Sequence, residues 1–238
     1  MKDLLGKALL AYYHDNSVEN PITETSISEA EELPLSHFFR DNNQMSALEK
    51  KALELAVGSI LDVGAGAGSH SLYLQEQRAM NVTSIDISEG ACEVCRLRGL
   101  KKVYQKDLFS FSDQKFDTLL LLMNGTGICG TYANLPFFLA KLKELLNENG
   151  QVLIDSSDLI YMFDEDDDGG RWIPTTTDYY GELTYQLYFK GQTEETFKWL
   201  YLDFNTLQMA CLAQDLSCEL VFEGDHYDYL ARITLKSR

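Results

Sequence analysis

The sequence has no long apolar run. No stretch of about 18 consecutive apolar residues occurs, which is the length that a membrane-spanning helix needs. Residues 1–7 also lack the apolar run and the small-residue cleavage site of a signal peptide. We therefore expect a cytoplasmic protein that does not enter a membrane.

Basic residues are scarce. The chain has 20 Lys and Arg residues against 37 Asp and Glu, which gives a formal net charge of −17. A phosphate backbone would on average be repelled by such a chain. The densest basic stretch is predicted to be a helix end and the start of the next strand, and it consists of Arg96, Arg98, Lys101, Lys102 and Lys106. We expect no nucleic-acid partner.

Candidate metal ligands are few. The five cysteines are an odd set without paired metal-type spacing, which argues against a disulfide framework. Cys92 and Cys95 form a C-x-x-C inside a predicted helix, where free cysteine serves as a small apolar packing residue. The acidic run at 164–168, followed by Gly169 and Gly170, lacks the ligand spacing of an EF-hand and is interpreted as a solvated loop. We expect no metal site.

The length indicates one domain with its own lid. The chain has 238 residues, of which 45% are apolar, enough for one substantial core. Residues 1–45 are predicted to form a helical lid segment, and residues 46–238 the main domain. A helical spacing of apolar residues appears at Leu4, Leu5, Ala8, Leu9, Tyr12 and Tyr13. The aromatic residues of this segment, which include Phe38 and Phe39, suit a lid and ordinary core packing equally.

Strands and helices alternate from residue 59 onwards. Short apolar runs predict strands at 60–63, 82–86, 102–105, 116–122 and 151–155. Further helices are predicted at 46–57 and 135–146, and a turn containing Gly150 begins the fifth strand. This alternation is typical of a parallel sheet with helices on both faces.

The C-terminal third has another pattern. Residues 182–203 are predicted to form an inserted β-hairpin that turns near Gly191, followed by a helix at 205–215. The last two strands, at 219–222 and 229–235, are joined by only a few residues. They must therefore be antiparallel, since a parallel crossover needs a dozen residues or more.

A glycine-rich loop follows the first strand of the main domain. It has Asp62 near the strand end and then alternate glycines at Gly64, Gly66 and Gly68. The first two permit a tight turn and close approach of a ligand, and the third lets the next helix pack on its strand. A dinucleotide loop reads G-x-G-x-x-G, whereas this one has Ser69 at the last position. The carboxylate would repel a diphosphate but suits a ligand with an ammonium group, such as the amino-acid part of S-adenosylmethionine.

Acids also end the next two strands. Asp86 ends the second strand, where a carboxylate can accept hydrogen bonds from ribose hydroxyls, and Ile87 would lie against an adenine. Asp107 ends the third, where it can meet the adenine amino group beside the Leu108 amide. Taken alone, each acid is more often an ordinary strand-end or helix-cap residue than part of a site. Together with Asp62 they lie at the carboxyl ends of three successive strands, where ligands bind in open α/β sheets.

These residues resemble the class I S-adenosylmethionine-dependent methyltransferases. Residues 62–68 match the family's glycine-rich first motif and Asp86 its acidic second motif, and the resemblance covers about residues 46–238. It implies a Rossmann-like seven-stranded sheet with helices on both faces and an antiparallel last strand. It also implies a binding role for each matching residue. The methionine part would be held by Asp62 and the backbone of Gly64, Ala65, Gly66 and Gly68, the ribose by Asp86, and the adenine by Ile87, Asp107 and Leu108.

The acceptor is expected beside the loop after the fourth strand. Family members that modify exocyclic amino groups or amides often carry Asn/Asp-Pro-Pro-aromatic there, whereas this chain has Asn124 followed by Gly-Thr-Gly. Those acceptors are therefore disfavoured, although Asn124 can still contact the cofactor. Residues that can line the acceptor side, or serve only as surface or capping residues, are Tyr12, Tyr13, His14, Arg40, Asp155, Ser156, Ser157 and Asp158. None is assigned as a catalytic base, because methyl transfer does not always require one.

The leading hypothesis is an S-adenosylmethionine-dependent methyltransferase that acts on a small molecule. The alternatives are a protein methyltransferase, a binding protein that kept the fold without catalysis, and a nicotinamide-dependent oxidoreductase. Ser69 in the loop disfavours the oxidoreductase, and the intact loop disfavours complete loss of cofactor binding.

Overall fold

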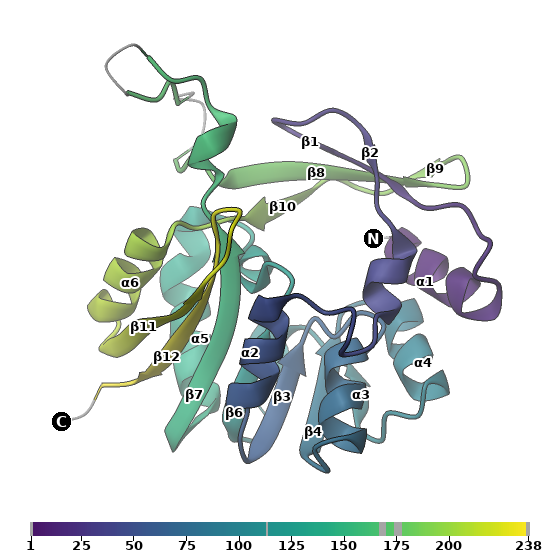
Figure 1. Ribbon diagram of the computed structural model, residues 1–238, viewed down its shortest axis with the longest axis horizontal. Helices are drawn as coiled ribbons and strands as arrows, with labels where there is room; N and C mark the ends of the chain where they lie inside the picture. Colours follow the sequence, from purple (N-terminus) through teal and green to yellow (C-terminus); the bar gives the residue numbers. More distant parts are fainter. Residues whose placement is uncertain (1, 113, 167–169, 174–177, 237–238) are drawn as a thin grey trace.

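A seven-stranded sheet forms the centre of the molecule (Figure 1). The computed structural model describes residues 2–112, 114–166, 170–173 and 178–236. The strand order is β11-β12-β7-β6-β3-β4-β5. The strands are β3 (Ser59–Val63), β4 (Asn81–Asp86), β5 (Val103–Gln105), β6 (Phe116–Leu121), β7 (Leu146–Ser157), β11 (Leu216–Glu223) and β12 (Asp228–Leu235). The strands from β3 to β7 are parallel, and β12 is antiparallel to both of its neighbours, which confirms the predicted fold.

Helices cover both faces of this sheet. They are α2 (Ala47–Leu55), α3 (Ser69–Glu76), α4 (Glu89–Leu97), α5 (Leu135–Leu145) and α6 (Phe204–Ala213). Successive strand residues point to opposite faces, so Leu61 belongs to the buried cluster under α5 and α6, while Ile60 belongs to the cluster under α2 and α3. Both side chains are fully buried. The continuous apolar runs in the sequence therefore reflect strands that are covered on two sides.

A second, antiparallel sheet lies across the carboxyl ends of the parallel strands (Figure 1). It has the order β10-β8-β1-β2, with β9 paired to β8. Its strands are β1 (Ile22–Thr25), β2 (Glu31–Glu32), β8 (Glu182–Phe189), β9 (Gln192–Thr193) and β10 (Phe197–Leu200). The predicted hairpin is confirmed as β8 and β10. The sequence did not predict β1 and β2, which are short and polar. Strand β1 pairs with the distant strand β8, and β2 pairs with β1.

The N-terminal segment packs against α4. It contains α1 (Leu4–His14) and the 3₁₀ helix η1 (Leu35–Phe39). Asp3 caps α1 by accepting from the Gly6 N–H (3.2 Å), and it also accepts from the Gly90 N–H in α4 (3.0 Å). Through β1 and β8 this segment shares one sheet with the hairpin. Residues 2–45 and the hairpin are thus joined through one sheet.

The remaining expectations concern membranes, metals and cysteines. No helix in the described ranges is long and apolar enough to cross a membrane. Within the same ranges, no three His, Cys, Asp or Glu side chains are grouped to hold a metal ion. Of the acidic run and the glycine after it, residues 167–169 lie outside the described residues.

Cys92 and Cys95 are fully buried in α4, and burial raises the pKa of Cys92 to about 11, as suits a packing residue.

Candidate active site

The loop between β3 and α3 is a tight turn tied to β4. Its glycines have left-handed φ angles: +71° at Gly64, +55° at Gly66 and +79° at Gly68. The N–H groups of Gly64 and Ala65 both donate to the Ile85 carbonyl, at 2.9 and 3.1 Å. A Cβ on Gly68 would lie 2.6 Å from Cδ1 of Leu100, so a side chain there would require Leu100 to shift. The left-handed φ angles agree with the tight turn that the sequence predicts.

Asp86 joins this loop to the end of β4. The Gly66 N–H donates to Oδ2 of Asp86 (2.9 Å), and the Ser88 N–H donates to Oδ1 (2.8 Å). Burial raises the pKa of Asp86, and the nearby carboxylates of Asp3 and Asp62 raise it further. Each carboxylate oxygen can accept more than one hydrogen bond. Asp86 therefore braces the glycine loop and keeps capacity to accept hydrogen bonds from a ligand hydroxyl.

Asp62 is a buried carboxylate beneath the loop. Its residue is only 2% exposed, and the Ser71 hydroxyl donates to its Oδ2 (2.6 Å). The same hydroxyl lies 2.7 Å from the hydroxyl of Ser84. Burial raises the pKa of Asp62, and a cationic partner beside it would favour the ionised carboxylate again. The sequence analysis did not identify Ser71 and Ser84. Ser84 is the register partner of Asp62 on β4, and Ser71 reaches the carboxylate from α3.

The ends of β4 and β5 form one border of the site. Ile87 is 52% exposed, and Nε2 of Gln105 donates to its carbonyl (3.2 Å). Asp107 is exposed and accepts from the Phe109 N–H (2.7 Å), so it caps the 3₁₀ helix η2 (Leu108–Ser110). Leu108 itself is buried. The structure thus brings Ile87 and Asp107 to neighbouring strand ends, with Asp107 partly occupied by its capping bond.

Asn124 lies in the loop after β6 with its side chain turned toward β7 and β10. The Ser156 hydroxyl donates to Oδ1 of Asn124 (2.9 Å), and Nδ2 donates to the Leu200 carbonyl (3.4 Å). The sequence analysis gave Asn124 as a candidate for cofactor contact. Because the side chain is already bonded, the backbone is the part of Asn124 that remains available.

A row of aromatic side chains on β8 and β10 covers the 3₁₀ helix η3 (Gly125–Cys129). Any side chain on Gly127 would collide with the ring of Trp199, so the indole rests directly on this glycine. Phe197 packs edge-on to Trp199 (6.2 Å between centroids) and stacks on Tyr185 (5.6 Å). The hydroxyl of Tyr185 lies 2.7 Å from that of Tyr201. We call these four residues, Tyr185, Phe197, Trp199 and Tyr201, the aromatic row.

The 3₁₀ helix η1 contacts the glycine loop from the N-terminal side. A Cβ on Gly66 would lie 3.3 Å from the ring of Phe38, and the Ser69 hydroxyl donates to the Phe38 carbonyl (2.7 Å). The other aromatics of this segment hold it to its neighbours: Tyr12 packs on Phe39 at 4.9 Å between centroids, and the Tyr13 hydroxyl donates to the Leu97 carbonyl (3.1 Å). His14 is exposed. Only Phe38 of these residues touches the glycine loop directly.

A buried charged network links this segment to the first turn of α3. Glu49 is 4% exposed, and its Oε1 lies 2.9 Å from Nη2 of Arg40 and 2.8 Å from Nε2 of His70. Its Oε2 accepts from the Ser46 N–H, completing a capping box at the start of α2. Burial alone would raise the pKa of Glu49, but its bond to His70 and the charges of His70 and Arg40 lower it to about 2. The Ser46-x-x-Glu49 spacing is a capping-box signal that sequence reasoning missed.

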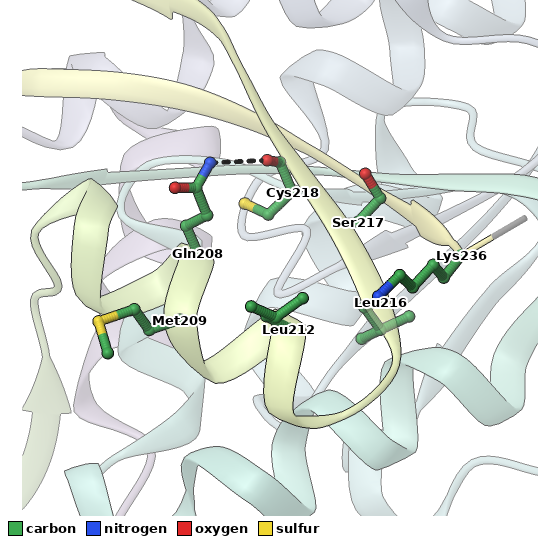
Figure 2. A pocket seen from close by; sticks show the side chains of 7 residues that line it. All are labelled: Gln208, Met209, Leu212, Leu216, Ser217, Cys218 and Lys236. Atoms are coloured by element: carbon green, nitrogen blue, oxygen red, sulfur yellow. Dashed lines mark hydrogen bonds between the residues drawn. The ribbon is translucent and has the colours of Figure 1, made fainter.

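A surface pocket lies at the opposite end of the sheet (Figure 2). It is lined by Gln208, Met209, Leu212, Leu216, Ser217, Cys218 and Lys236, and Nε2 of Gln208 donates to the Cys218 carbonyl (3.1 Å). Leu216 pairs with Leu235, and the neighbouring Thr234 pairs with Gln151, which is itself paired with Thr118 near the start of β6. The pocket is therefore near the amino ends of the parallel strands and does not belong to the candidate site.

The fold and the site together define a Rossmann-like methyltransferase. A protein-family model described as a methyltransferase domain matches residues 61–154 of the chain. A crystal structure of an S-adenosylmethionine-dependent methyltransferase from Bacteroides fragilis, in complex with S-adenosyl-L-homocysteine, is 43% identical with a TM-score of 0.91. The match covers 99% of this chain and 96% of that one. The chain belongs to the S-adenosylmethionine-dependent methyltransferase family, and it is an enzyme that uses this cofactor.

More distant structures share the fold. The sugar N-methyltransferase KedS8 from Streptoalloteichus is 16% identical with a TM-score of 0.59, over 88% of this chain and 96% of that one. The CcbJ methyltransferase from Streptomyces caelestis is 12% identical with a TM-score of 0.62, over 80% of this chain and 90% of that one. No curated protein sequence matches the chain.

Proposed function

We propose that this methyltransferase acts on a small-molecule acceptor bound beside the loop after β6, under the second sheet. The observation that carries this proposal is the second sheet, which lies across the carboxyl ends of the parallel strands and rests on η3 through Trp199 and Gly127. A small molecule can be enclosed under such a cover more readily than a segment of a folded protein. The formal net charge of −17 further disfavours nucleic acid.

The proposed cofactor site consists of the residues predicted from the sequence. Bound S-adenosylmethionine supplies an electrophilic methyl carbon on a sulfonium. Asp62 suits its ammonium group because burial disfavours a lone carboxylate there, and Asp86 has lone pairs for the ribose hydroxyls. The methionine part is assigned to Asp62 and the backbone of Gly64, Ala65, Gly66 and Gly68, the ribose to Asp86, the adenine to Ile87, Asp107 and Leu108, and a backbone contact to Asn124.

Positioning and exclusion of water are the catalytic contributions that this arrangement favours. Methyl transfer needs the nucleophile, the methyl carbon and the sulfur in line, so a fixed geometry lowers the entropic part of the barrier. The aromatic row covers the site from the hairpin side and Phe38 from the N-terminal side. These apolar groups exclude water from the reacting centre.

Isotope transfer tests the acceptor class. The protein is incubated with S-adenosylmethionine labelled in the methyl group, separately with the small-molecule fraction and with the protein fraction of a bacterial cell extract. We expect the label in a compound of the small-molecule fraction, and no transfer when the protein is omitted.

Two other outcomes would contradict this proposal. Label found only in the protein fraction would identify a protein methyltransferase. Tight binding of S-adenosylmethionine in calorimetry, without label in either fraction, would favour a non-catalytic binding protein.

A further inference from the structure

Asp155 holds the backbone of the loop after β6. The Met123 N–H donates to its Oδ2 (3.1 Å) and the Gly125 N–H to its Oδ1 (2.8 Å). The N–H groups of the residues on either side of Asn124 thus both donate to one carboxylate near the end of β7. The next residue of β7, Ser156, bonds the Asn124 side chain (2.9 Å).

The conformation that these bonds hold is an unfavourable one. Met123 and Asn124 have φ angles of +66° and +62°, so two successive non-glycine residues are left-handed. A left-handed φ is unfavourable for residues that carry a Cβ, and such residues persist only where their surroundings determine them. The Asp155 carboxylate and the Ser156 hydroxyl are the groups that supply this restraint.

This loop borders the glycine loop directly. Strands β3 and β6 are neighbours in the sheet, so the segments that follow them emerge side by side. A Cβ on Gly64 would lie 3.3 Å from Cδ1 of Ile128 in η3, which shows that the two segments touch. On its other side, η3 carries the indole of Trp199 on Gly127. The loop after β6 and η3 therefore lie between the glycine loop and the aromatic row.

We propose that Asp155 is a positioning residue for methyl transfer, which fixes the left-handed Met123–Asn124 loop between the glycine loop and the aromatic row. The placement of the acceptor at this loop rests on the proposed function. Asp155 acts through the backbone that it holds, and both of its side-chain oxygens are needed because each accepts one of the two N–H groups. Loss of one acceptor releases the strained backbone and misaligns the reacting groups.

Asp155→Asn tests this role with little change in size. An amide has one oxygen, and its NH₂ group would face a peptide N–H, so one of the two bonds is lost. Asp117→Asn is the matched control. Asp117 accepts from the Ser59 N–H (2.8 Å) and from Nδ2 of Asn147 (2.7 Å), and it lies at the amino end of the sheet near the start of β6.

Three measurements on the full chain separate positioning from general stability. Hydrogen exchange of the peptide covering residues 119–130 is expected to rise by about tenfold in Asp155→Asn and to stay unchanged in Asp117→Asn. Transfer of labelled methyl from saturating S-adenosylmethionine, to whichever extract fraction the wild type labels, is expected to fall by roughly 10- to 100-fold only in Asp155→Asn. The calorimetric Kd for S-adenosylhomocysteine is expected to change by less than about threefold.

Several results would overturn the proposal. Wild-type exchange of the 119–130 peptide in Asp155→Asn, or transfer rates equal to those of Asp117→Asn, would show that the carboxylate does not position the loop. Label in the protein fraction would refute the small-molecule acceptor. The difference in transfer rate between Asp155→Asn and Asp117→Asn would then still decide whether Asp155 positions the loop. A wild type that binds S-adenosylhomocysteine and labels neither fraction would refute both proposals.

A second variant guards against a folding defect. If Asp155→Asn does not fold, Asp155→Glu keeps the charge and both oxygens but moves them by one methylene. It is expected to lower the transfer rate while leaving the Kd for S-adenosylhomocysteine within about threefold of wild type. An unchanged transfer rate in a folded Asp155→Glu enzyme would count against the proposal.

Discussion

Replacing Asp86 by alanine is expected to weaken the binding of S-adenosylhomocysteine by about 10- to 100-fold, which corresponds to the roughly 1–3 kcal/mol cost of unsatisfied buried groups. The substitution removes the acceptor of the Gly66 and Ser88 N–H groups, at 2.9 and 2.8 Å. It also removes the carboxylate proposed to hold the ribose. The glycine loop loses a brace and the ligand loses a partner at the same time, and titration calorimetry measures the sum.

The matched control for this variant is Asp117→Ala. Asp117 is likewise a carboxylate that accepts a backbone N–H, but it does so at the amino end of the sheet. The Asp117→Ala variant is expected to leave the Kd for S-adenosylhomocysteine unchanged. Wild-type affinity in a folded Asp86→Ala protein would remove Asp86 from the cofactor site.

Glu49→Gln is expected to lower the free energy of unfolding at neutral pH by roughly 3 kcal/mol. The carboxylate lies between Arg40 and His70, at 2.9 and 2.8 Å, and its residue is only 4% exposed. Its pKa falls from 4.5 to about 2 in the folded state, and a shift of that size corresponds to roughly 3 kcal/mol. A neutral amide cannot stabilise the two buried partners in the same way.

The pH dependence has a defined sign. Because the folded pKa of Glu49 is lower than its unfolded value, the stabilisation is present above 4.5 and is lost as the pH falls from 4.5 toward about 2. The stability difference between wild type and Glu49→Gln should therefore shrink in acid. Denaturant unfolding of both proteins across this range measures it.

Glu54→Gln on the same helix is the control for this prediction. Glu54 pairs with Lys51 at 3.1 Å, but its side chain is 69% exposed, so the pair should contribute less than about 1 kcal/mol. Equal stabilities of the Glu49 and Glu54 variants at neutral pH would show that the buried network does not stabilise the fold.

The central sheet could be predicted from the sequence because its signals are local. The first strand was predicted at 60–63 and lies at Ser59–Val63, and the helix predicted at 135–146 lies at Leu135–Leu145. Apolar runs bounded by turns are enough to locate such elements. Strands β1 and β2 could not be found in this way, since Ile22–Thr25 is mostly polar and is a strand only through pairing with β8.

The candidate site was predictable where it depends on strand ends alone. Asp86 and the glycine loop were expected to meet, and the Gly66–Asp86 hydrogen bond shows that they do. The Asn124 side chain points to Ser156 and Leu200 because of the register of β7 and the fold of the hairpin. Asp155 was a candidate for lining the acceptor side, but its bonds to the loop backbone depend on two left-handed residues that no pattern announces.

The most direct test of the account is a crystal structure of the protein with S-adenosylhomocysteine. The account predicts the amino-acid part of the ligand at Asp62 and the glycine loop of residues 64–68, the ribose hydroxyls on the Asp86 carboxylate, and the adenine beside Ile87 and Leu108. A ligand bound elsewhere, or one whose ribose does not contact Asp86, would contradict it.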